Sequence, residues 1–188
     1  MVRGMKPGPA HPDQTTARGA RSRPTPIGAL LRGLVAGTIS VAGFDVVNLI
    51  HYRRGGGDAG PLGWELSRGL PWANAPAPAQ VGRRAVNGIF KIELAEHRAP
   101  LVNNRVHRSY GIGWASFFGL VEASRARPRL RDGLAFGTFV WLAGYGILPL
   151  AKLYRPLWTY DRSTLGWDLG AHLAYGLTAA AALKLFNR

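Results

Sequence analysis

The sequence predicts an all-α, polytopic membrane protein in which four transmembrane helices form two parallel-repeat hairpins. Three observations lead to this prediction: four long windows are almost free of charge, arginines gather before and between them, and two short motifs recur in the same order in both halves. Each window is close to the ~20 residues that a helix needs to cross a ~30 Å hydrocarbon core. The windows predict helices over about residues 27–50, 104–123, 132–150 and 164–186.

Composition narrows the class of protein. The 188 residues carry 24 Lys and Arg against 10 Asp and Glu, a formal charge of +14, and no cysteine. Disulfides, thiolate metal sites and a cysteine nucleophile are therefore excluded. The positive charge fits either a nucleic-acid binder or a membrane protein with cytoplasmic arginines, and its absence from the four windows favours the membrane protein. A soluble helical bundle is the alternative, because the mean hydropathy is only −0.02.

The arginines predict how the helices are oriented. A basic tail over residues 1–26 is rich in Pro, Gly and Thr, and we expect it to be disordered. The positive-inside rule places this tail, the turn after the second window and the C-terminus in the cytoplasm. We expect the protein to lie in the inner membrane of a bacterium, with both termini in the cytoplasm. The basic turn is expected to attract anionic lipids there. The basic residues of the turn are Arg125, Arg127, Arg129 and Arg131.

The remaining chain, residues 27–188, forms one transmembrane domain with a long outer loop over residues 51–103. Within this loop, Val81, Ala85, Ile89 and Ile92 recur at helical spacing and predict an amphipathic helix over about residues 79–98. The second window gains its full length if Asn103 or Asn104 caps its start. Glu122, beside the arginine-rich turn, is expected to be a local ion-pair partner.

The internal repeat rests on two motifs. Gly-Leu-x-x-Gly-Thr begins at Gly33 and again at Gly133, and His-x-x-Tyr-Gly begins at His107 and again at His172. In each half the glycine motif comes first and the histidine motif follows in the next helix. The common order predicts a duplicated hairpin whose copies are related by a pseudo-two-fold axis along the membrane normal.

The glycines of the first motif have a structural interpretation. Glycines four residues apart clear one stripe of a helix and allow a neighbouring backbone to approach. The stripes predict that the first and third helices form the central pair, and a homodimer would use the same surface. The packing residues are Gly33, Gly37, Gly133 and Gly137.

A layer of polar side chains is predicted in the outer half of the bundle. Ionisable residues inside a bilayer are costly and are candidates for function by default. Three interpretations stand: hydrogen bonds that fix the register of the helices, a proton or ion path, and a metal site of two histidines and two carboxylates. The layer consists of Asp45, His107, Tyr110, Tyr145, Asp168, His172 and Tyr175.

No catalytic motif supports an enzyme: Gly-x-Ser-x-Gly, His-Glu-x-x-His and Walker sequences do not occur. We expect no cofactor, no resident metal and no nucleic-acid partner. The predicted function is a non-enzymatic scaffold, or a lipid-contacting or stress-related helical bundle. The alternative is a small transporter or a proton or ion conductor that uses the Asp/His/Tyr layer.

The chain resembles the YagU-like family of uncharacterised bacterial inner-membrane proteins. The resemblance covers the glycine-rich first helix and the stretch from His107 to Tyr175. It implies a helical inner-membrane protein of unsettled molecular activity. Its motifs are the His107-x-x-Tyr110 opening, Pro128 before Gly133-Leu134-x-x-Gly137, Pro149-Leu150, Pro156-Leu157-Trp158 and the late His172.

Overall fold

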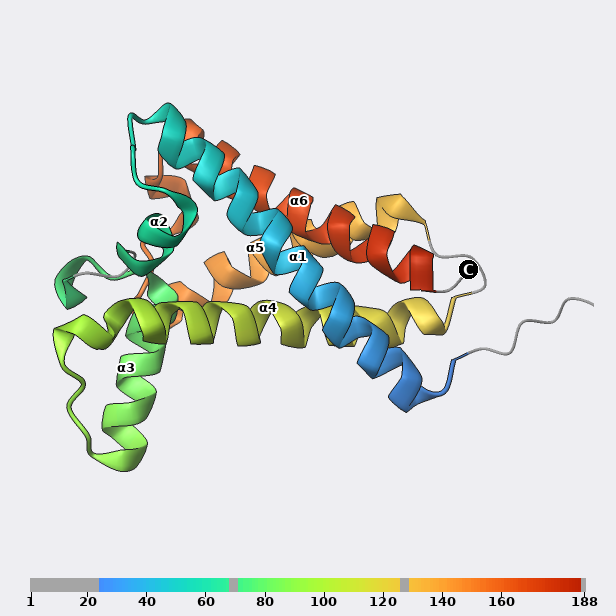
Figure 1. Cartoon of the computed structure of the whole chain (residues 1–188), viewed down its shortest axis with the longest axis horizontal. Helices are drawn as coiled ribbons and strands as arrows, with labels where there is room; N and C mark the ends of the chain where they lie inside the picture. The colour runs from blue at the N-terminus through green and yellow to red at the C-terminus, as the bar shows by residue number, and fades with distance from the viewer. Residues whose placement is uncertain (1–23, 68–70, 126–128, 187–188) are drawn as a thin grey trace, which may run out of the picture.

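The computed structural model describes residues 24–67, 71–125 and 129–186, and the regular structure in these ranges is entirely helical. Four long helices build the bundle, with shorter helices gathered at one of its ends (Figure 1). Most of the predicted N-terminal tail lies outside the described residues, and so does Arg127. The long helices are α1 (Pro26–Arg54), α4 (Ala99–Ala123), α5 (Leu130–Leu150) and α6 (Arg162–Phe186).

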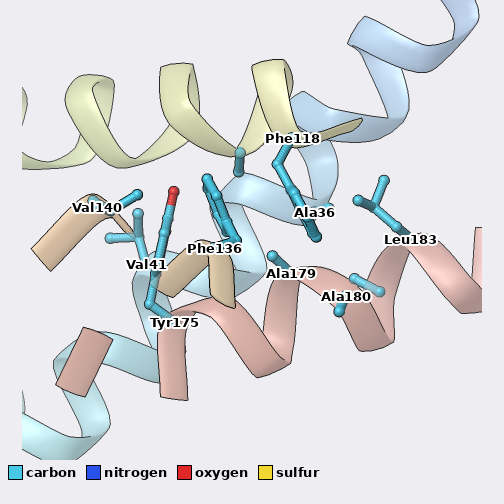
Figure 2. Packing of buried hydrophobic residues seen from close by; sticks show 11 residues of the cluster. Ala36, Val41, Phe118, Phe136, Val140, Tyr175, Ala179, Ala180 and Leu183 are labelled. Atoms are coloured by element: carbon cyan, nitrogen blue, oxygen red, sulfur yellow. The ribbon is translucent and has the colours of Figure 1, made fainter. Parts of the chain in front are cut away.

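The helices pack in a ring. Helix α1 lies against both α4 and α6, and α5 lies against α6. Aromatic side chains make the contact between α4 and α5. The ring centroids of Phe118 and Phe136 are 4.3 Å apart in a stacked pair, and those of Trp114 and Phe139 are 5.3 Å apart. Figure 2 shows this core, where Phe118 and Phe136 lie above Ala179 and Ala180 of α6. Small residues on α6 and large rings on α5 therefore share the interior.

The prediction that the first and third windows, α1 and α5, form the central pair is wrong. The glycine motifs of these helices pack against α4 and α6 instead. A Cβ atom added to Gly33 would lie 2.6 Å from the Cα of Ser116 on α4. A Cβ added to Gly137 would collide with the carbonyl oxygen of His172 on α6. Each glycine stripe thus holds its helix against the next long helix in the chain. The stripes are occupied inside the bundle, so a homodimer would need another surface.

Polar caps begin three of the long helices. Thr25 accepts a hydrogen bond from the Gly28 N–H at 3.1 Å ahead of α1, and a capping box at Asp132 begins α5. Asp161 accepts hydrogen bonds from the side chain and the N–H of Thr164, at 2.6 and 2.8 Å, ahead of α6. Those hydrogen bonds, the side-chain one foremost, lower the pKa of the exposed Asp161 carboxyl.

Two helix boundaries differ from the predicted ones. Helix α4 begins at Ala99, with Pro100 in its first turn, so neither Asn103 nor Asn104 caps it. Proline is favoured there because its missing N–H is not needed in the first turn. In the outer loop α3 (Ala77–Phe90) ends where Lys91 adopts φ 58°, a left-handed conformation, and the helix does not continue to residue 98. The apolar Ile92 continued the helical pattern past this point and misled the prediction.

The shorter elements lie at the end of the bundle opposite the start of α1 and the end of α6 (Figure 1). Trp72 is buried and its indole N–H donates to the Leu94 carbonyl at 3.1 Å, which ties the segment before α3 to the segment after it. Besides α3 these elements are α2 (Pro61–Ser67) and the 3₁₀ turns η2 (Trp72–Asn74), η3 (Glu96–Arg98) and η4 (Leu157–Thr159).

Three described helices, α1, α5 and α6, are long and apolar enough to cross a membrane. Helix α4 has 25 residues, as many as α6, but carries Arg105 and Arg108 near its start. These charges lower its mean hydropathy. The described chain is thus an all-helical protein compatible with a membrane location.

Candidate functional site

A cavity of about 300 Å³ opens among the four long helices, near the end that carries α3. Three aromatic or apolar residues, Phe44, Trp141 and Leu148, form much of its wall together with the start of α3. Six of the seven residues of the predicted polar layer also line it. They are His107, Tyr110, Tyr145, Asp168, His172 and Tyr175.

The seventh residue of the layer, Asp45, lies behind the wall. Its Oδ1 is 3.7 Å from Nε2 of His107, so it forms a charge pair between α1 and α4 when that histidine is protonated. Side chains from both predicted hairpins therefore meet around a single space.

The second Asp–His pair belongs entirely to α6. His172 Nδ1 is 2.8 Å from the main-chain carbonyl oxygen of Asp168 and 3.5 Å from its Oδ1. A carbonyl oxygen can only accept, so Nδ1 carries the proton and a neutral ring has its acceptor at Nε2. The Trp141 indole N–H donates to Asp168 Oδ2 at 3.0 Å, and the Tyr145 hydroxyl also interacts with this carboxylate. The Asp168 carboxylate is thus held at the wall by three neighbours.

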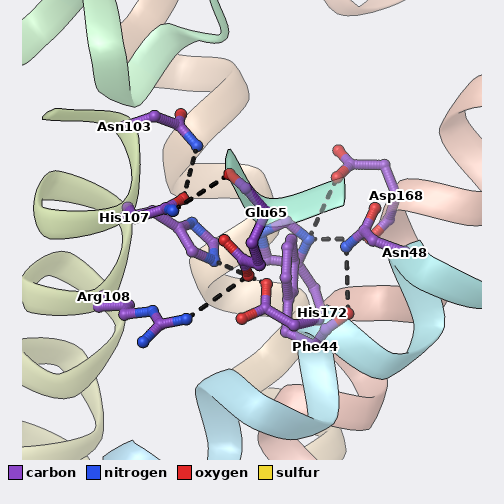
Figure 3. Close-up of polar contacts among 10 residues, drawn as sticks. Phe44, Asn48, Glu65, Asn103, His107, Arg108, Asp168 and His172 are labelled. Atoms are coloured by element: carbon purple, nitrogen blue, oxygen red, sulfur yellow. Dashed lines mark hydrogen bonds and ion pairs between the residues drawn. The ribbon is translucent and has the colours of Figure 1, made fainter. Parts of the chain in front are cut away.

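Phe44 separates the two histidines. Its ring centroid lies 4.9 Å from that of His107 and 5.0 Å from that of His172, and Figure 3 shows it between them. Within the described ranges no three His, Asp or Glu side chains form a group that could hold a metal ion. The metal interpretation, two histidines and two carboxylates on one ion, is therefore not what this geometry provides.

The inner end of the cavity is closed by a hydrogen bond between helices. The hydroxyl of Tyr175, a side chain only 3% exposed, donates to the Gly111 carbonyl of α4 at 2.5 Å. The stacked rings of Phe118 and Phe136 and the buried Leu183 fill the bundle beyond it. The bundle is thus filled on this side of the cavity.

Aromatic side chains form the wall beside α5. Tyr145 packs against Trp141 and Tyr154, each with ring centroids 5.2 Å apart, and against Tyr160 at 5.5 Å. Tyr154 follows α5 in the loop, and burial raises the pKa of its hydroxyl above the usual value of 10. This hydroxyl is therefore a neutral hydrogen-bond donor at any physiological pH.

The first turn of α3 lies at the mouth of the cavity. Pro76, Ala77 and Pro78 line it, and Arg84 on the same helix donates to the Ala151 carbonyl at the end of α5, at 2.5 Å. This contact joins the outer-loop helix to the far side of the mouth. The start of α3 therefore forms part of the boundary of the cavity.

Some lining residues were not singled out from the sequence. Trp141 lies four residues before Tyr145 and shares its helix face, which was an available signal. Phe44 precedes Asp45, and no pattern marked it as the residue between two histidines. Gly144 leaves open space, because a Cβ added there would meet nothing within 4 Å. Tyr154 follows the end of α5, where sequence periodicity gives no signal.

The arginine-rich turn lies at the opposite end of the bundle and is not part of the cavity. Arg125 lies 3.4 Å from Glu122 and 2.9 Å from Asp132, which confirms the expected ion pair at Glu122. Arg129 contributes its main-chain N–H to the capping box of α5, and the side chain of Arg131 is exposed. Arg125 thus pairs with two carboxylates, one at the end of α4 and one at the start of α5.

Comparison with protein-family models, with curated proteins and with solved structures finds no match for this chain. The resemblance to the YagU-like family stays a prediction. The functional argument therefore rests on the geometry of the cavity.

Proposed function

We propose that this chain is a non-enzymatic integral membrane protein that binds a small molecule in the intramembrane cavity between its four long helices. The observation that carries the proposal is the convergence of His107, the Asp168–His172 pair and an aromatic wall on one space of about 300 Å³. A concave, mostly apolar space with a few placed polar groups is the usual form of a small-molecule site.

The outer surface of the bundle supports a lipid environment. Large apolar side chains point away from the interior along the long helices, whereas soluble monomers expose few contiguous apolar surfaces. The interior is held by small residues, which is typical of packing between helices in membranes. Examples of the exposed side chains are Leu31, Val35 and Ile39 on α1 and Phe139 and Leu142 on α5.

We also propose that all four long helices span the membrane, α4 being the least apolar of them. The arginines of α4 lie in its first half, where Arg108 lies 3.5 Å from Glu65 of α2, and the only other Asp, Glu, Lys or Arg of this helix is Glu122 near its end. The start of α1, the end of α4, the start of α5 and the end of α6 lie at one end of the bundle (Figure 1). Arginines gather at that end, which supports a cytoplasmic location for it in a bacterial inner membrane.

The proposed duplication is supported by the burial of corresponding positions. Gly33, Ala36, Gly37 and Ser40 are buried in α1, and the residues that lie 100 positions later are buried in α5. Thr38 and Thr138 also make the same bond, from the hydroxyl to the carbonyl four residues earlier, at 3.1 and 2.9 Å. The two halves therefore present equivalent faces to their partners, α4 and α6.

Substituted cysteines test the binding site, because the chain has no cysteine of its own. Gly144 and Gly146 lie on α5, and a Cβ added to either meets nothing within 4 Å, but only Gly144 lines the cavity. We expect Gly144→Cys to react with the neutral, water-soluble reagent 2-hydroxyethyl methanethiosulfonate. Gly146→Cys, the matched control, faces lipid and should react poorly, since a thiol there is not ionised. A Gly144→Cys that reacts no faster than Gly146→Cys would contradict an accessible cavity.

A small transporter is the second candidate, and the Asp168–His172 pair on the cavity wall favours it. Ionisable groups that face an internal cavity mark transport paths in many membrane proteins. A conductor that is permanently open finds less support, because the bundle is filled beyond Tyr175. Flux into proteoliposomes that is lost on Asp168→Asn would identify a transporter, whereas binding without flux identifies a binding protein.

A further inference from the structure

We infer that the cavity takes a small organic cation, an amine or quaternary ammonium with an apolar body. This inference rests on the proposed function, since it names the class of ligand for the same cavity. It is carried by the combination of an aromatic wall with the Asp168 carboxylate and by a described lining that contains no Lys or Arg.

The aromatic wall has the composition of a cation site. Tyr145 lies between Trp141 and Tyr154, and Tyr110 and Phe44 add rings from α4 and α1 to the lining of the same space. The faces of such rings carry negative potential and attract ammonium groups, most strongly where water is excluded. Their apolar area also accommodates the body of the ligand.

The charges of the lining point the same way. Asp168 is the one carboxylate among the described lining residues, and these residues include no Lys or Arg. Trp141, Tyr145 and His172 all interact with this carboxylate, so it acts on a cation through its negative charge, and a quaternary ammonium needs no hydrogen bond from it. A neutral His172 adds an acceptor at Nε2. An anionic ligand would meet repulsion from the Asp168 carboxylate and no Lys or Arg among the described lining residues.

The volume limits the size of the cation. A cavity of about 300 Å³ lies at the lower end of the range for small-molecule sites. Benzyltrimethylammonium is a suitable probe, because it combines a quaternary head with one aromatic ring. Neopentylbenzene has the same shape with carbon in place of the charged nitrogen and is the matched neutral control.

The test measures how each probe protects Gly144→Cys from 2-hydroxyethyl methanethiosulfonate in lipid nanodiscs, with probe concentrations corrected for partition into lipid. We expect benzyltrimethylammonium to halve the rate at a concentration at least about tenfold below that of neopentylbenzene. In the Asp168→Asn background this preference should fall below about threefold. Asp58→Asn removes an exposed carboxylate outside the cavity and should leave the preference unchanged.

The outcomes separate the two proposals. Equal protection by both probes, or stronger protection by benzenesulfonate, overturns the cation inference and leaves the cavity as a binding site. Protection by neither probe overturns the cation inference, and failure of Gly144→Cys to react at all overturns the proposed function as well. If Asp168→Asn does not fold, as judged by circular dichroism and gel filtration, Tyr154→Leu replaces it. That variant leaves the Asp168 contacts in place and should lower the affinity for the cation alone, by about fivefold.

Discussion

Replacing Gly137 by alanine tests the close contact between α5 and α6. A Cβ at this position would collide with the His172 carbonyl oxygen and lie 2.9 Å from its carbonyl carbon and 3.3 Å from the Leu173 Cα. All three atoms belong to the main chain of α6, so no side chain can rotate away. The two helices must instead move apart.

The magnitude follows from two opposing effects. Overpacking in a well-packed interior costs about 1–3 kcal/mol, and a collision with main chain belongs near the upper end of that range. Alanine in the interior of a helix gains up to about 1 kcal/mol over glycine. The net expectation for Gly137→Ala is a loss of about 1–2 kcal/mol. Gly170→Ala, on α6, is the matched control: its Cβ meets nothing within 4 Å, so it should be neutral or stabilising.

The assay is reversible unfolding by dodecyl sulfate in mixed micelles, followed by circular dichroism, with the free energy taken from the linear dependence on denaturant fraction. Gly137→Ala should unfold at a lower fraction than the native chain, and Gly170→Ala at an equal or higher one. The close contact would be refuted if Gly137→Ala were at least as stable as Gly170→Ala.

Three further predictions follow from other contacts. Tyr175→Phe removes a buried hydrogen bond between α6 and α4 and should lower the unfolding free energy by about 0.5–1.5 kcal/mol in the same assay, whereas an unchanged midpoint would argue against the bond. The lowered pKa of Asp161 means that its contribution to stability is present above the unfolded pKa of about 3.9 and is lost as pH falls through the folded pKa. Asp161→Asn should therefore flatten the fall in melting temperature on acidification, and an identical fall in the variant would exclude this source. Trp72→Ala cuts the link between the segments before and after α3 and should raise the rate at which Gly144→Cys is modified by about tenfold, while a slower or unchanged rate would mean that α3 does not limit access.

Sequence patterns predicted the long helices because charge exclusion over some twenty residues is a local property. Local patterns also place residues at similar heights along the bundle, and six residues singled out in this way line one cavity. The depth of His107 and of His172 follows from counting along each helix. Their positions on either side of Phe44 do not, because the rotation of one helix against another depends on packing.

The choice of packing partners could not be predicted from the glycine stripes. A stripe of small residues shows that some backbone comes close but does not identify which one, and α1 and α5 each meet the next long helix. The end of α3 was missed because Lys91 adopts a left-handed conformation that is uncommon for lysine. The mouth of the cavity was missed for a related reason, since Pro76 and Tyr154 come from loops without periodicity.

Gly144 lies 100 positions after Phe44, and in the proposed duplication these two residues correspond. One half of the protein thus fills this position with a phenyl ring, and the other half leaves it empty. An unfilled space lowers the stability of the fold. A native chain retains such a space when its function needs it. Gly144→Phe would make the two halves alike at this position, and the resulting protein should be more stable and unable to bind. The missing side chain at Gly144 is thus one contribution to the space that the cavity occupies.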